Sequence, residues 1–149
     1  MAKDGKHVIH AGGVFPNPLL NTEGNADAAT LPGRVVVQSA TGLALSAGTE
    51  ARIKYVANHN YLTPSGSGTL VDTAIPAGEN MVAIQPLPGM FLNVRAIAGL
   101  TITKGAPVYV TAAGRITATG ADGAVPFAYA EESITTATVA DDLVRVVFN

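Results

Sequence analysis

Three histidines are the first side chains to consider for metal or acid–base chemistry: His7, His10 and His59. His7 and His10 stand three residues apart, a spacing that serves a metal ion when both residues lie on one face of a helix. Glycines on both sides of this pair disfavour a helix there. The chain has no cysteine and no His-Glu-x-x-His motif. The sequence therefore predicts no metal site and no cofactor.

Adjacent carboxylates occur twice, at Glu131-Glu132 and at Asp141-Asp142. Neighbours along a strand point to opposite faces, so an adjacent pair rarely forms an acid/base couple. We expect these side chains to solvate loops or to accept hydrogen bonds from turn amides. Two serines in the Gly-Ser run at 65–68 lack the Gly-x-Ser-x-Gly pattern of a nucleophile. The sequence predicts no catalytic residue and indicates that the chain is not an enzyme.

The composition indicates which elements surround these side chains. The 149 residues suffice for one domain with its own core. Apolar residues make up 48% of the chain but aromatic residues only 5%, so Ala, Val and other small or β-branched side chains must fill that core. From residue 34 onward, short apolar runs alternate with turn signals. We predict an all-β fold, a small single-domain β-barrel or β-sandwich over residues 34–149.

The clearest strand signals lie in the last third of the chain. Residues 107–111 and 115–119 are two β-rich runs, and Gly114 between them supplies the positive φ that a tight hairpin turn demands. Two further runs, at 125–131 and 143–148, follow after turn residues. Strands at this spacing are typical of a barrel or sandwich.

Two earlier segments also predict strands. Residues 51–57 alternate, which places Ile53, Tyr55 and Ala57 on one buried face. The apolar runs 81–87 and 90–98 are joined by a Pro-Gly turn and indicate a hairpin or a sharp corner.

Residues 1–33 differ from the rest because glycine, proline and asparagine break them up. The segment nevertheless carries large apolar side chains and therefore needs a partner surface. Three interpretations are open: it folds back on its own domain, it reaches a neighbouring subunit, or it is disordered. We predict an extended N-terminal arm in which Val14, Phe15, Leu19 and Leu20 contact a neighbour. Deletion of residues 1–33 should then abolish binding and leave the β domain folded.

Charge and hydropathy exclude several classes of partner. Charged residues make up 13% of the chain, the net charge is −2, and the basic residues are scattered, unlike a nucleic-acid-binding surface. No apolar run approaches the ~18 residues of a membrane span, and no apolar leader follows the N-terminus. We expect no nucleic acid and no membrane among the partners, and synthesis in a cytoplasm.

Residues 103–117 read T-K-G-A-P-V-Y-V followed by A-G-R-I-T, and this pattern resembles the K-G-x-x-V-Y-V … x-G-x-I-T hairpin of bacteriophage capsid cement, or decoration, proteins. The run 125–131 resembles that family's I-G-x-A-x-E strand, although Phe127-Ala128 stands where the family often has Ile-Gly. Residues 143–147 resemble its closing V-R-V strand. The resemblance covers 103–149, about a third of the chain.

The resemblance implies a homotrimer on the outer surface of an expanded phage head, made in the host cytoplasm and incorporated into the virion. Its partner would be the major capsid protein at the junctions between subunits, contacted through the N-terminal arm. Such a protein stabilises the shell because it binds only the mature arrangement.

Three other functions share parts of this pattern. A tail or baseplate β module would have the same composition. A carbohydrate-binding module is disfavoured because its sites present exposed Trp or Tyr platforms, and the chain has no Trp. A small β-barrel enzyme could still assemble a site from distant residues at a subunit boundary.

Overall fold

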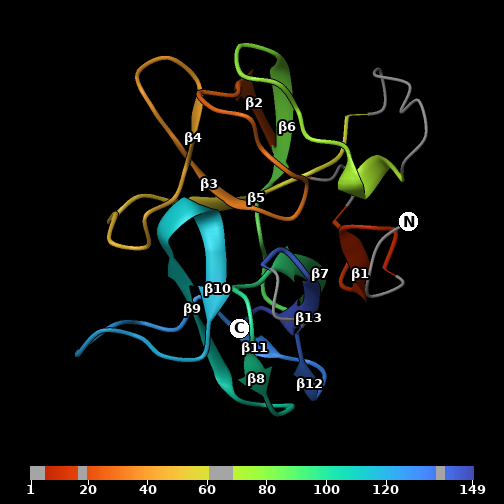
Figure 1. The fold of residues 1–149 in the computed structure, drawn as a ribbon, viewed down its shortest axis with the longest axis vertical. Helices are drawn as coiled ribbons and strands as arrows, with labels where there is room; N and C mark the ends of the chain where they lie inside the picture. The colour runs from red at the N-terminus through yellow and green to blue at the C-terminus, as the bar shows by residue number, and fades with distance from the viewer. Residues whose placement is uncertain (1–5, 17–19, 61–68, 137–139) are drawn as a thin grey trace.

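The structure is a computed structural model that describes residues 6–16, 20–60, 69–136 and 140–149. Within these ranges it is all-β, as predicted, with two 3₁₀ turns and no α-helix. The strands form a six-stranded, a five-stranded and a two-stranded sheet (Figure 1).

The six-stranded sheet runs in the order β1, β7, β13, β11, β9, β10, and every neighbouring pair is antiparallel. Its strands are β1 (His10–Gly13), β7 (Met90–Arg95), β9 (Pro107–Thr111), β10 (Arg115–Thr117), β11 (Ala128–Ala130) and β13 (Leu143–Val147). The turn η2 (Ala112–Gly114) joins β9 to β10.

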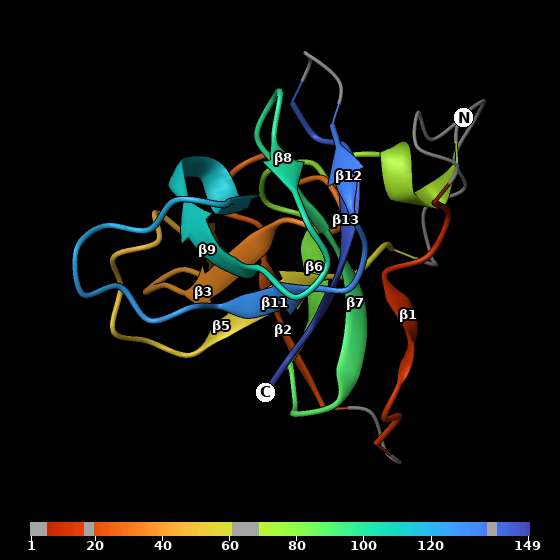
Figure 2. The same ribbon diagram turned by 90° about the horizontal axis from the view of Figure 1, so that it is seen from below.

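The five-stranded sheet runs in the order β2, β6, β5, β3, β4. Its strands are β2 (Asn21–Asn25), β3 (Val35–Gln38), β4 (Leu43–Leu45), β5 (Lys54–Ala57) and β6 (Asn80–Ile84). A small two-stranded sheet pairs β8 (Thr101–Ile102) with β12 (Ile134–Thr135), and the turn η1 (Leu70–Asp72) precedes β6. Figure 2 shows β1 on the side of the molecule opposite the loop between β10 and β11.

The main core lies between the two large sheets. β7 is its principal strand, because Met90, Leu92 and Val94 all point into it and are fully buried. β13 contributes Leu143, Val144 and Val146 from the neighbouring strand. Small and β-branched side chains fill most of the core, as the low aromatic content predicts.

A second, smaller core lies inside the curl of the five-stranded sheet. It contains Val36, Tyr55, Met81 and other buried residues. The sheet curls so far that its two edges touch: Ala26, just after β2, forms a parallel bridge with Leu43 at the start of β4. This curl gives the sheet two buried faces, one toward each core.

β5 shows the consequence of lying between two cores. Val56 packs into the main core, whereas Tyr55 and Ala57 pack into the second core. The prediction of alternation is therefore confirmed for Tyr55 and Ala57 but wrong for Ile53. Ile53 precedes β5, which begins at Lys54, and is 59% exposed.

The connection between β6 and β7 is a sharp corner and not a hairpin, because β6 pairs within the five-stranded sheet and β7 within the six-stranded sheet. The β9–β10 hairpin is confirmed, with Thr111 opposite Arg115. Its turn requires glycine at position 114, where φ is +66, because a Cβ atom added there would lie 2.2 Å from the carbonyl oxygen of Val35. That contact fixes the hairpin against β3.

The extended arm is not confirmed by the described part of residues 1–33. β1 pairs with β7, and β2 pairs with β6 over all five of its residues. Ile9 is 1% exposed in the main core, and Ala26 is equally buried in the second core. Glycine and proline keep these strands short, but an edge strand needs only four or five residues to pair.

Candidate functional site

Four large apolar side chains near the N-terminus are exposed, and we call them the N-terminal apolar surface: Val8, Val14, Phe15 and Leu20. Their exposed fractions are 50%, 51%, 63% and 41%, in that order. Three of the four predicted contact residues are thus exposed. The fourth, Leu19, lies outside the described residues.

The corner between β6 and β7 positions this surface. The amide of Val14 donates a hydrogen bond to the carbonyl oxygen of Gly89 at 2.8 Å. The amide of Gln85 donates one to the carbonyl oxygen of Leu20 at 2.9 Å. Val14 and Leu20 therefore flank the same turn although they stand six positions apart in the chain. Phe15 is held by an edge-to-face contact with the ring of His10, with ring centroids 5.0 Å apart.

The arrangement can do one thing chemically, which is to exclude water from an apolar partner surface. Ile9 anchors the segment in the core while Val8 faces solvent. Because the backbone that carries these side chains is already fixed, a partner that covers them has little backbone left to order. The N-terminal apolar surface is thus suited to a protein contact.

A charged cluster at the junction of the two large sheets is the most elaborate polar arrangement among the described residues. We call it the Asp141 cluster: Arg34, Arg95, Arg115 and Asp141. Arg34 Nη2 lies 2.7 Å and 2.9 Å from the two carboxylate oxygens of Asp141. Arg115 donates from Nε and Nη2 to the same two oxygens, each at 3.1 Å.

Arg95 completes the cluster through backbone carbonyls. Its side chain donates to the carbonyl oxygens of Pro32, Val71 and Asp141, and it is 4% exposed. Arg34 also donates to the carbonyl oxygen of Ala113 in the hairpin turn at 2.5 Å. The cluster thereby ties segments that lie more than a hundred residues apart in the sequence.

The electrostatics of the cluster favour the ionised carboxylate. Burial raises the pKa of Asp141, but the hydrogen bonds and charges of Arg115 and Arg34 outweigh it and hold that pKa below its usual value. Burial lowers the pKa of Arg34. Asp141 also has φ +84, a conformation that aspartate and asparagine tolerate better than most residues. The cluster therefore has the character of a structural ion-pair network and not of an acid–base site.

Sequence reasoning missed this cluster. Arg34, Arg95 and Arg115 are 61 and 20 positions apart along the chain and look like scattered surface charges. One signal could have found it: Arg95 stands between Val94 and Ala96 inside an apolar strand, and an arginine there needs a buried partner.

One further carboxylate touches the cluster, since Asp72 Oδ1 lies 3.4 Å from Arg95 Nη2, and two others pair with lysines elsewhere. Glu131 pairs with Lys104 at 2.6 Å, and Glu132 pairs with Lys6 at 3.1 Å. His59 is buried, and burial lowers its pKa.

Among the residues that the structure describes, no group of three or more His, Cys, Asp or Glu could hold a metal ion. No helix in the described ranges has the length and hydropathy needed to span a bilayer.

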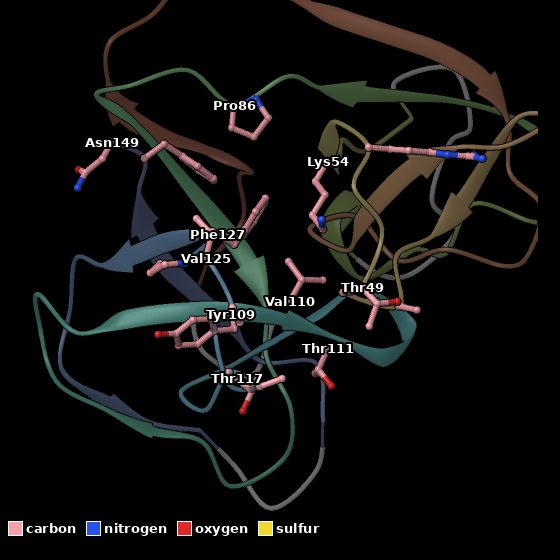
Figure 3. A pocket seen from close by; sticks show the side chains of 18 of the residues that line it. Thr49, Lys54, Pro86, Tyr109, Val110, Thr111, Thr117, Val125, Phe127 and Asn149 are labelled. Atoms are coloured by element: carbon pink, nitrogen blue, oxygen red, sulfur yellow. The ribbon is translucent and has the colours of Figure 1, made fainter.

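A surface groove of about 560 Å³ lies on the outer side of the β9–β10 hairpin (Figure 3). Its borders are the 47–54 segment, the 86–88 turn, the 119–127 loop and the C-terminal Phe148 and Asn149. The volume lies within the ~300–1,000 Å³ of ligand pockets. Sequence reasoning did not find this groove, since its walls come from five separate segments.

No protein-family model matches the chain, and no curated protein matches it by sequence. A solved structure does match in fold: the N base of head fiber gp8.5 in bacteriophage phi29, with a TM-score of 0.53. The alignment covers 88% of this chain and 94% of that chain at 16% sequence identity. The similarity shows that the two chains share an all-β fold over nearly their whole length.

Proposed function

We propose that this protein is a structural component of a bacteriophage virion that binds the outer surface of the head as a decoration protein. The observation that carries the proposal is the fold shared with the N base of a phage head fiber, which spans 88% of this chain. The cement-protein motifs at 103–149 support it independently, because they come from the sequence alone.

The N-terminal apolar surface is the proposed contact with the major capsid protein. Two of its exposed residues, Val14 and Leu20, are tied by backbone hydrogen bonds to the β6–β7 corner. We propose that Val14, Phe15 and Leu20 supply most of the binding free energy, since a few apolar anchors usually dominate an interface. Leu19 belongs to the same sequence run and is retained in the proposal.

The proposal includes a homotrimer. Three copies attached to one head multiply weak individual contacts, so each copy needs only modest affinity. Sedimentation equilibrium of the purified protein measures this directly: a mass of three chains is expected, and a monomer at all concentrations would remove the trimer from the proposal.

Co-sedimentation with purified phage particles tests the head assignment. The protein should pellet with expanded heads and stay in solution with unexpanded heads and with isolated tails. Pelleting with tails alone would instead favour a tail or baseplate module.

Point substitutions test the contact surface better than removal of residues 1–33, because that deletion takes Ile9, β1 and β2 out of the fold. Phe15→Ser should weaken binding to expanded heads at least tenfold, about 1.4 kcal/mol. Ile53→Ser is the matched control, with 59% exposure against 63% for Phe15. Equal binding by both variants would contradict the proposed surface.

A further inference from the structure

The groove beside the β9–β10 hairpin has an apolar side that is already ordered. The rings of Phe127 and Phe148 pack edge to face with centroids 5.2 Å apart. Val125 stands at the rim and is 86% exposed, the most exposed large apolar side chain among the described residues. Apolar side chains of a ligand can therefore pack here without rearrangement of the protein.

The groove is also positively charged. Arg52 and Lys54 line it, and no Asp or Glu side chain does. In Figure 3 the amine of Lys54 points into the space that Val110 and Phe127 face. The groove is thus lined by two cationic residues as well as by an apolar surface, and the Lys54 amine is directed into it.

These two cations have no carboxylate partner among the described residues. Arg52 donates to the carbonyl oxygen of Gln38 at 2.7 Å, and Lys54 donates to that of Glu50, also at 2.7 Å. The carboxylate of Glu50 is turned to other donors, the hydroxyl of Ser46 and the amides that follow it. Both cations keep free N–H groups for an anionic ligand.

Three threonine side chains from the hairpin and the loop after it also line the groove. Thr111 and Thr117 come from adjacent strands, and Thr119 follows them. Hydroxyls along a hairpin suit the polar backbone of an extended chain better than a compact ligand, because such a backbone presents donors and acceptors at regular intervals.

We propose that this groove binds an extended acidic peptide segment of another protein. Its carboxylates would contact Arg52 and Lys54, and its apolar side chains would pack on Val125 and Phe127. The charge complementarity between an acidic segment and the unpaired cations selects this occupant over a basic or neutral one. The inference goes beyond the head-binding proposal and does not depend on it.

An NMR titration without any phage particle tests the inference. The probes are two pools of capped heptapeptides: one alternates Asp or Glu with Val, Leu or Pro, and the other has Asn or Gln in place of the acids. The acidic pool should shift the backbone amides of Tyr109, Val110 and Thr111 and bind at least fivefold more tightly than the neutral pool. Absence of shifts, or equal affinity for both pools, overturns the proposal.

Variants that each remove one positive charge test whether the acidic peptides bind in the groove or are attracted to positive charges anywhere on the protein. Lys54→Gln should weaken the acidic pool about tenfold. Arg145→Gln is the matched control, since Arg145 is exposed on β13 and does not line the groove. If Lys54→Gln disturbs amides outside the groove, Arg52→Gln replaces it, because Arg52 is exposed and precedes β5. Equal weakening by the groove variant and by Arg145→Gln would refute the site.

Discussion

Replacing Asp141 by asparagine should destabilise the protein strongly. Asparagine keeps the size of the side chain and tolerates the positive φ of this position. The substitution leaves Arg34 and Arg115 without their shared carboxylate. Breaking a buried ion pair from one side costs about 3–5 kcal/mol. Because the Asp141 side chain retains 20% exposure, solvent offsets part of that cost, and we expect about 3 kcal/mol.

Urea unfolding measures this free energy, and a melting curve provides a second readout. For a domain of this size, 3 kcal/mol corresponds to a fall in Tm of roughly 6–12 °C. Asp122→Asn is the control, because Asp122 is exposed in the loop between β10 and β11 and should change stability by less than about 0.5 kcal/mol. If Asp141→Asn changed the free energy of unfolding as little as this control, the assignment of the Asp141 cluster as a structural ion-pair network would be refuted.

Three further predictions test other parts of the fold. The free energy of unfolding should decline as pH falls below about 4, because the lowered pKa values of Asp141 and Glu50 stabilise the folded state only while those carboxylates are ionised. Asp141→Asn should flatten that decline. If urea titrations across pH 3 to 5 gave the variant the same slope as the unchanged protein, this prediction would be wrong. Gly114→Ala should cost about 2–3 kcal/mol through its clash with Val35, whereas an unchanged urea midpoint would mean that the turn moves freely. Ile9→Ala should cost about 3 kcal/mol if the N-terminal segment belongs to the core, and a loss below about 0.5 kcal/mol would show that it packs only loosely.

The sequence predicted the elements that depend on local patterns. The β9–β10 hairpin followed from two β-rich runs around Gly114, and the all-β class followed from composition and turn spacing. The exposure of Ile53 escaped prediction, because alternation within a strand cannot reveal where the strand begins.

The strand pairing of the N-terminal segment and the charged cluster escaped prediction for a different reason, although a segment folded back on its own domain was one of the interpretations left open. β1 has no strand pattern of its own and forms because β7 offers an unpaired edge about 80 residues later. Similarly, Arg34 and Asp141 meet only when the two large sheets pack. Contacts of this kind depend on the assembled fold, and no local periodicity encodes them.

The position of β13 has a consequence for how the chain folds during synthesis. Of the described strands β13 is the one furthest along the chain, yet it lies inside the six-stranded sheet between β7 and β11. Until it emerges from the ribosome, both neighbours expose unpaired backbone edges, and the main core lacks Leu143, Val144 and Val146. Such long-range pairing slows folding. Nascent chains that stall before residue 143 should therefore aggregate, which makes the synthesis of β13 the step on which correct folding depends.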